Sequence, residues 1–194
     1  MRQSCLKDRD PKLLMRCKII LMSLGGSPVK KVAVIMGSKS DLPIAEKAVG
    51  VLQEYGIETE VRVLSAHRCP NEVREFASTA RESGFFVIIA FAGMAAHLAG
   101  AIAANTTLPV IGVPCSGAKL DGMDALLATV QMPSGIPVAT VAVDGGKNAA
   151  ILAIQMLALS DEGLAQKLQD ARAAETANVL AADKEVKEHF KMKV

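Results

Sequence analysis

Residues 31–41 read KVAVIMGSKSD, and this stretch decides the fold class. Its first six residues form an almost continuous apolar run, which is typical of a strand buried on both faces of a parallel sheet. Gly37 then permits a tight turn, and the polar SKSD segment offers capping side chains for a helix with Pro43 in its first turn. The stretch therefore predicts a buried strand that leads directly into a helix.

The same alternation continues along the chain. We expect further strands at ETEVRVL (58–64), FFVIIAFAG (85–93), LPVIGVP (108–114) and VATVAV (138–143). The expected helices are a segment that Gly56 ends, a segment from Pro70 to Gly84, MAAHLAGAIAAN (94–105), DGMDALLATV (121–130) and KNAAILAIQMLAL (147–159). Strands that alternate with helices indicate a parallel sheet with right-handed crossovers. The sequence thus predicts a three-layer α/β/α domain, which we place at residues 31–160.

The first thirty residues are expected to lie outside this domain. Their apolar stretch, LLMRCKIILMSL, is interrupted by Arg16 and Lys18 and is followed by no clear cleavage site. It is also too short and too charged to span a bilayer. We therefore interpret residues 1–30 as an N-terminal extension of the core.

Residues 161–194 form a charged, helix-favouring tail. Leu164, Leu168 and Ala171 make a narrow apolar stripe on it, and no strand remains for this helix to cover. The tail is either a solvated extension or a helix that docks on another subunit. Because the stripe needs a partner, docking is the favoured interpretation.

The composition excludes several classes of function. The chain has 194 residues with 51% hydrophobic residues, a formal net charge of +2, 3% aromatic residues and no Trp. A nearly neutral chain with so few aromatic residues is not typical of a protein that binds nucleic acid or an anionic membrane. Cys5, Cys17, Cys69 and Cys115 show no CxxC or zinc-finger spacing, which favours reduced thiols in a cytoplasmic protein. Cys69 is either an activated nucleophile or, as we favour, a small filler.

Polar clusters follow three of the expected strands, namely GSKSD (37–41), SAHR (65–68) and AGMAAH (92–97). In an open parallel sheet, ligands bind beyond the carboxyl ends of the strands. Ser38 and Ser40 could donate hydroxyl hydrogens to a phosphate, and Arg68 carries a planar fork that fits two phosphate oxygens. Asp41 is either a helix cap or an acceptor for sugar hydroxyls. Because neither GxGxxG nor GxxxxGK[ST] occurs, a monophosphate is the expected ligand rather than a dinucleotide or a triphosphate.

The three histidines differ in their expected roles. His67 is the expected proton carrier, because it lies beside Arg68 in the SAHR turn and the unperturbed pKa of a histidine is near neutral. His97 lies in an expected apolar helix, where a packed histidine, one that orients a loop and a catalytic one are all open interpretations. His189 is expected on the surface of the tail. No metal-ligand spacing and no cofactor fingerprint is present, so the inventory fits a cofactor-free proton-transfer or rearrangement enzyme acting on a phosphorylated small molecule.

These motifs together resemble a known family. GSKSD, SAHR, AGMAAHLAG, VQMPSGIPVATVAV and KNAAILAIQML, in this order, are similar to the N-carboxyaminoimidazole ribonucleotide mutases of purine biosynthesis, the PurE family. The resemblance implies a flavodoxin-like fold, a homo-octamer with the C-terminal helix reaching over neighbouring subunits, and a reaction without cofactor or metal. That reaction moves a carboxylate from the exocyclic nitrogen of an aminoimidazole ring to a ring carbon.

The resemblance also implies roles for particular residues. It assigns proton transfer to His67 and substrate contacts to Ser38, Asp41 and Arg68, with Ser40 and Ser65 in the same motifs. It places Gly93 and His97 in the segment that lines a carbon dioxide pocket.

A second branch of the family, the carboxylases that use free carbon dioxide, tends to carry lysine at the position of Arg68 and a polar segment in place of GMAAHL. Arg68 and the AAHL stretch therefore favour the mutase branch. The chain departs from the family pattern at Phe91, Met94, Ala99 and Cys115, and the two bulky residues Phe91 and Met94 are expected near the pocket. The alternatives are a carboxylase with the same site and a non-catalytic flavodoxin-like module that binds a nucleotide.

Overall fold

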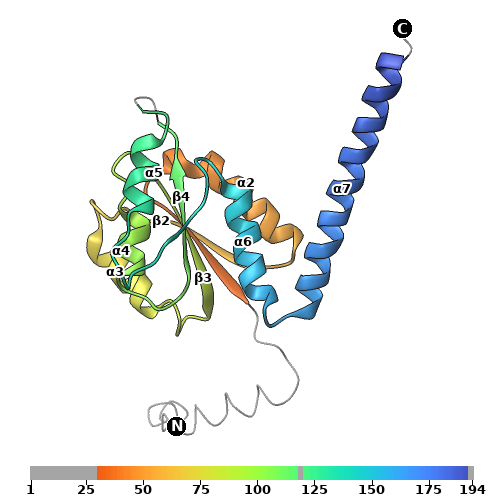
Figure 1. Cartoon of the computed structure of the whole chain (residues 1–194). Coiled ribbons are helices and arrows are strands. Elements are labelled where there is room, and N and C mark those ends of the chain that lie inside the picture. The colour runs from red at the N-terminus through yellow and green to blue at the C-terminus, as the bar shows by residue number, and fades with distance from the viewer. Residues whose placement is uncertain (1–29, 118–119, 192–194) are drawn as a thin grey trace, which may run out of the picture.

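The computed structural model describes residues 30–117 and 120–191, so the expected N-terminal extension lies outside the described residues except for Lys30. Within them the chain forms a five-stranded parallel sheet with the order β2-β1-β3-β4-β5. The strands are β1 (Lys31–Met36), β2 (Glu58–Val63), β3 (Phe85–Gly93), β4 (Val110–Cys115) and β5 (Ala139–Thr140). This order is that of the flavodoxin-like folds, and the predicted three-layer α/β/α class is confirmed (Figure 1).

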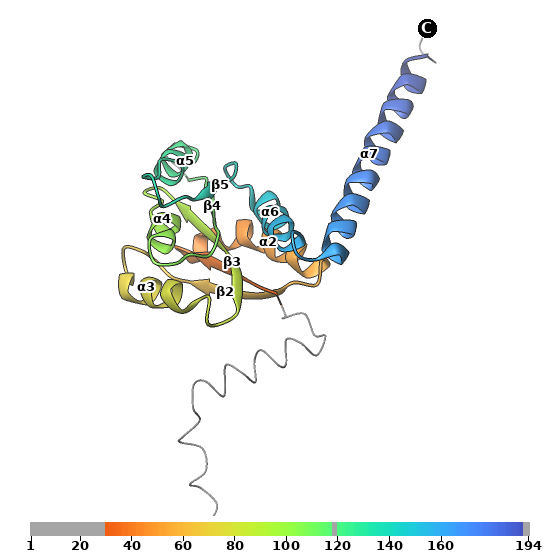
Figure 2. The ribbon, with the colours of Figure 1, turned by 60° about the horizontal axis from the view of Figure 1, so that its bottom comes forward.

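Helices cover both faces of the sheet, because the central strands are apolar on both sides. On one face lie α2 (Leu42–Glu54) and α6 (Gly146–Ala158), which pack on the alternate β1 residues Val32, Val34 and Met36. On the other lie α3 (Pro70–Thr79), α4 (Leu98–Ala103) and α5 (Met123–Val130), as Figure 2 shows. Ala33 and Ile35 of β1 point to this second layer, and both are fully buried. Because successive side chains of a strand point to opposite faces, β1 contributes to two separate hydrophobic cores.

Three elements are shorter than the sequence predicts, and one of them is α3, which ends at Thr79 and not at Gly84. The helix expected from residue 94 begins only at Leu98, because Met94 has a left-handed backbone (φ 54°) and the residues after it form tight turns. Strand β5 has two residues instead of six, although the Val141 N–H still donates to the Gly112 carbonyl at 3.0 Å. A short 3-10 helix, η1 (Lys39–Asp41), also precedes α2. Apart from the end of α3, these differences lie near the carboxyl ends of the strands.

The tail is a single long helix, α7 (Glu162–Lys191), and its first turns contact the chain's own core. Leu164 is 6% exposed and Leu168 is half-buried against the α2–α6 layer, whereas Ala171 is exposed. The expectation that the whole stripe lacks a partner in its own domain is therefore wrong, because α6 and α2 leave a hydrophobic edge that the first turns of α7 cover. Every described residue beyond Leu168 is exposed, and Figures 1 and 2 show this part of α7 projecting away from the domain.

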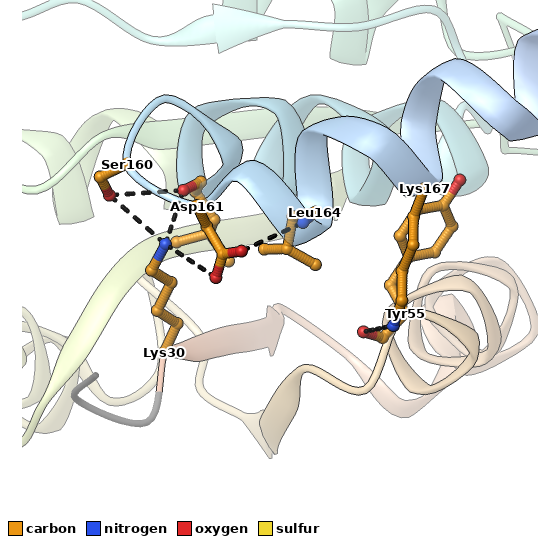
Figure 3. A network of polar contacts seen from close by, with 7 residues as sticks. Lys30, Tyr55, Ser160, Asp161, Leu164 and Lys167 are labelled. Carbon is orange, nitrogen blue, oxygen red and sulfur yellow. Dashed lines mark hydrogen bonds and ion pairs between the residues drawn. The ribbon is translucent and has the colours of Figure 1, made fainter. Parts of the chain in front are cut away.

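Polar contacts fix the junction between α6 and α7. The Lys30 ammonium donates to the Leu157 carbonyl at 2.7 Å and lies 3.3 Å from a carboxylate oxygen of Asp161. Asp161 in turn accepts the Leu164 N–H at 3.1 Å, which caps α7, and Lys167 reaches the Tyr55 carbonyl at 3.5 Å (Figure 3). The domain boundaries 30/31 and 160/161 stay a prediction, but Lys30 and Asp161 join the two sides. No helix in the described part of the chain is long and apolar enough to cross a bilayer.

Candidate active site

The polar segments that follow the strands converge on one open cavity of about 640 Å³. Its lining is Gly37, Ser38, Ser40, Asp41, Ser65, Ala66, His67, Arg68, Ala92, Gly93, Met94, Ala95, His97, Leu98, Ser116 and Gly117. Every site residue that the sequence predicts lines this cavity, so the structure brings the whole predicted set together. A larger hollow of about 860 Å³ lies at the opposite edge, but no histidine, serine pair or strand carboxyl end converges on it.

The corner after β1 is held by a reciprocal capping box. The Ser38 hydroxyl accepts the Ser40 N–H at 3.3 Å, while the Asp41 carboxylate accepts the Ser38 N–H at 3.1 Å and the Ser40 hydroxyl at 3.3 Å. Asp41 is only 8% exposed, and this burial raises the pKa of its carboxyl group, against the hydrogen bonds from Ser38 and Ser40 and the charge of Arg68. Asp41 therefore does act as a cap, and its remaining lone pairs face a cavity that could hold a sugar.

The turn after β2 carries Arg68 across to the end of β1. Its Nη2 donates to the Gly37 carbonyl at 2.8 Å, and its Nε donates to the Ser65 hydroxyl at 3.2 Å. Both acceptors are neutral, and among the described residues no carboxylate lies within ion-pair distance of Arg68. The guanidinium is thus oriented but keeps its positive charge uncompensated by a direct ion pair, as an anion site requires.

Cys69 stabilises the same turn. Its sulfur accepts the Ser65 N–H at 3.0 Å and lies 3.3 Å from the Ser65 carbonyl oxygen. The thiol is half-buried, does not line the cavity and packs at the start of α3. These contacts support the small structural role that the sequence favours over a nucleophile.

The two histidines of the domain face each other in the cavity. His67 Nε2 and His97 Nδ1 are 2.8 Å apart, and the two rings meet edge to face with centroids 5.0 Å apart. The expectation that His97 lies inside a helix is wrong: it precedes the first residue of α4, is exposed, and bonds across to His67. One of the two nitrogens must accept, so at least one ring is neutral while the bond is made.

Close packing against β4 requires a small residue at the end of β3. Gly93 pairs with Cys115 of β4, and a Cβ at Gly93 would lie 3.2 Å from the Cys115 carbonyl oxygen. Met94 is 66% exposed and lines the cavity, whereas Phe91 is fully buried in the layer under α2 and α6. Phe91 is therefore not a pocket residue, contrary to the expectation from sequence.

Cys115 and Ala99 are buried as well, so Met94 is the one family departure that reaches the cavity among the described residues. Burial, followed by the charges of Asp41 and Asp144, raises the pKa of the Cys115 thiol to about 12. This thiol is neutral and inert in the folded protein at physiological pH.

Sequence reasoning missed one wall of the cavity, formed by Ser116 and Gly117. The signal was available, because CSG (115–117) follows the fourth strand as SAHR follows the second. In the described residues, no cluster of three or more His, Cys, Asp and Glu side chains is arranged to hold a metal ion.

A flavodoxin-like domain with an arginine, serine hydroxyls and two facing imidazoles over its strand ends defines a small-molecule enzyme of the open α/β class. A family model described as AIR carboxylase matches residues 31–178. The chain belongs to this AIR carboxylase (PurE) family.

The chain is 57% identical over 160 residues to the N5-carboxyaminoimidazole ribonucleotide mutase of Methanocaldococcus jannaschii, covering 82% of this chain and 99% of that protein. It is 45% identical over 155 residues to the chloroplastic phosphoribosylaminoimidazole carboxylase of Vigna aconitifolia, covering 80% of this chain and 28% of that protein. The crystal structure of Treponema denticola PurE superposes with a TM-score of 0.73 at 28% identity, over 80% of this chain and 98% of that chain.

Proposed function

We propose that this protein is an N5-carboxyaminoimidazole ribonucleotide mutase, an isomerase that forms 4-carboxy-5-aminoimidazole ribonucleotide in de novo purine biosynthesis. The observation that carries this proposal is the 57% identity to a mutase of which the chain covers 99%. Arg68 and three residues of the AAHL stretch, Ala95, His97 and Leu98, line the cavity, and the sequence associates both features with the mutase branch. We place this reaction in the cytoplasm, a compartment that keeps thiols such as those of Cys69 and Cys115 reduced.

In this proposal the substrate phosphate binds between Arg68 and the two serines that follow β1, Ser38 and Ser40. Arg68 offers a charged fork without a carboxylate ion pair among the described residues, and Ser38 and Ser40 offer hydroxyls at the start of η1. Asp41 accepts ribose hydroxyls with the lone pairs that the capping box leaves unused. Ser65 orients Arg68 through its hydroxyl, which accepts the Arg68 Nε–H.

His67 supplies both proton transfers. As the carbamate C–N bond breaks, the His67 imidazolium donates a proton to the departing nitrogen, which gives carbon dioxide and a neutral amine. The ring carbon then attacks carbon dioxide and forms the new C–C bond. The neutral imidazole of His67 removes the proton from that carbon, which restores the aromatic ring and the imidazolium, so atoms and charge balance over the cycle.

Carbon dioxide must stay beside the ring between the two steps. Gly93, at the end of β3, and His97, just before α4, both line the cavity and would form this pocket, with His97 in contact with His67. Retention replaces a bimolecular encounter, and effective molarities of ~10⁵ M or more are attainable in such cases. His97 Nδ1 also contacts His67 Nε2 at 2.8 Å and so orients the His67 ring in the cavity.

The test has two substrate arms and one variant. The parent should turn over the carbamate substrate without bicarbonate, and should use aminoimidazole ribonucleotide with bicarbonate poorly. Efficient use of the second substrate pair alone would instead identify the carboxylase, and turnover of neither would favour the non-catalytic nucleotide-binding module. His67→Asn should lower turnover by at least ~10²–10⁴ with binding retained. His189→Asn, a matched change on the exposed part of α7, should leave turnover unchanged.

The proposal includes a homo-octamer in which α7 beyond Leu168 packs on neighbouring subunits. Val179 and Val186 are 66% and 55% exposed and lie seven residues apart, on the helix face that Leu164 and Leu168 begin. A closed symmetric assembly would cover this face. Removing residues 172–194 keeps Leu164 and Leu168 in their core contacts. It should lower the number of subunits per particle, measured by light scattering, while the domain still unfolds cooperatively. A full-length monomer with full activity would contradict the proposed assembly.

A further inference from the structure

Asp144 has a backbone conformation that most residues avoid. It lies between β5 and α6 with a φ of 57°, in the left-handed region, where residues other than glycine are strained. Asp and Asn tolerate this region best among the non-glycine residues, because their short side chains bond locally. A strained residue that persists must be held by its surroundings, which makes those surroundings informative.

The side chain and the backbone N–H of Asp144 both bond to the same short backbone segment, residues 114–116. Its carboxylate Oδ1 accepts the Ser116 N–H at 2.8 Å, and its own N–H donates to the Pro114 carbonyl at 2.9 Å. These two bonds lie beyond the two-residue ladder of β4 and β5, which ends at the Gly112–Thr140 pair. Asp144 therefore continues the connection to the end of β4 after strand pairing has stopped.

The segment that Asp144 holds is a wall of the cavity. Ser116 and Gly117 line it, next to the end of β3 where Gly93 pairs with Cys115. Gly122 also packs closely on this wall, because a Cβ there would lie 3.2 Å from Ser116 Cα. Ser116 is thus held by a hydrogen bond from its N–H and by close backbone packing.

We propose that Asp144 is a positioning residue for the mutase reaction, acting by holding the Ser116–Gly117 wall against the bound ribonucleotide. Asp144 does not itself line the cavity, so its effect passes through the Ser116 backbone. The bond needs an acceptor oxygen in a left-handed residue and does not need its negative charge. This inference rests on the proposed function, but its structural half can be measured without turnover.

Three variants separate the bond from the backbone strain. Asp144→Gly relieves the left-handed strain and removes the acceptor, whereas Asp144→Asn keeps both an acceptor oxygen and a residue type that tolerates this conformation. Asp121→Gly is the matched control, because Asp121 is also left-handed (φ 48°), is exposed, and makes no recorded side-chain hydrogen bond to the described part of the chain.

Asp144→Gly should raise KM for the carbamate substrate about tenfold, the equivalent of about 1.4 kcal/mol, with a smaller change in kcat. Its melting temperature should stay within about 4 °C of the parent, because relieved strain offsets the lost bond. Asp144→Asn should recover most of the KM, and Asp121→Gly should match the parent. Hydrogen exchange should show faster exchange of the Ser116 amide in Asp144→Gly, and near-parent protection in Asp144→Asn.

An unchanged KM in Asp144→Gly overturns the proposal, as does equal damage in the asparagine variant or in Asp121→Gly. A parent without mutase turnover contradicts the proposed function instead, and the Ser116 amide exchange then still decides whether Asp144 holds this wall. Unchanged exchange in Asp144→Gly overturns the inference whatever the enzyme's activity.

Discussion

Arg68→Ala should weaken ribonucleotide binding strongly and stability hardly at all. In the structure the guanidinium is exposed and donates to two neutral acceptors, the Gly37 carbonyl at 2.8 Å and the Ser65 hydroxyl at 3.2 Å. Such bonds contribute about 0.5–1.5 kcal/mol each when shielded, and less at an exposed site. We therefore expect a loss of at most about 1 kcal/mol in the free energy of unfolding, or about 2–4 °C in melting temperature.

The loss in binding is expected to be larger because a phosphate contact is charge-assisted. Contacts of this kind are worth about 1.5–3 kcal/mol, which corresponds to a rise of ~10–150-fold in Kd. Arg68→Lys should recover only part of the affinity, because lysine keeps the charge but lacks the planar fork.

Calorimetry on the carboxylated ribonucleotide product and on its dephosphorylated nucleoside gives the decisive comparison. Removing the phosphate should cost much affinity in the parent and little in Arg68→Ala. Arg81→Ala is the matched control, since Arg81 is an exposed arginine at the opposite edge of the sheet that also bonds neutral acceptors, the Thr107 hydroxyl and carbonyl. If the phosphate contributes equally to affinity in the parent and in Arg68→Ala, Arg68 does not bind it.

Three further predictions concern packing, thiol chemistry and acid stability. Gly112→Ala should lower the free energy of urea unfolding by ~1–3 kcal/mol, because the added Cβ would overlap Thr129 Cγ2 on α5; parent-like stability would contradict this close approach. Iodoacetamide at pH 8 should leave Cys115 unmodified in the folded protein and modify it in urea, since burial raises the pKa of this thiol to about 12; peptide mass spectrometry showing modification before unfolding would refute this. The Leu164 N–H, then Lys30, lower the pKa of Asp161 in the folded state against desolvation, so its stabilising effect is present above the unfolded pKa near ~3.9 and is lost as pH falls through the folded value. Asp161→Asn should therefore flatten the fall of melting temperature between about pH 5 and pH 3, and an unaltered acid slope would count against the contact.

Local patterns in the sequence predicted the central strands well. The run at residues 85–93 gave β3 with its observed bounds, because a buried parallel strand must be apolar on both faces. Composition misled at residues 94–97, where Ala-rich sequence favours helix but the chain must first turn out of β3, and Met94 takes a left-handed conformation to do so. A propensity summed over neighbours does not contain that constraint.

The site residues were predictable as a set, but their contacts were not. The rule that ligands bind at the carboxyl ends of strands places His67 and His97 at the same end of the sheet. Their 2.8 Å contact depends in addition on the order β2-β1-β3, because the loops after β2 and β3 then flank the end of β1. The Asp144–Ser116 bond likewise joins residues 28 apart through the pairing of β4 with β5. Such contacts follow from tertiary arrangement, and no spacing in the sequence specifies them.

The junction in Figure 3 means that the α/β unit starts and finishes at one point on its surface. Lys30, which precedes β1, touches Asp161, which follows α6, at 3.3 Å, on the edge of the sheet away from the cavity. A unit with adjacent termini can be fused to other chains, or inserted between them, without moving its catalytic edge. The same adjacency makes the unit suitable for circular permutation, with residues 161 and 30 linked and new termini opened in a surface loop far from the cavity.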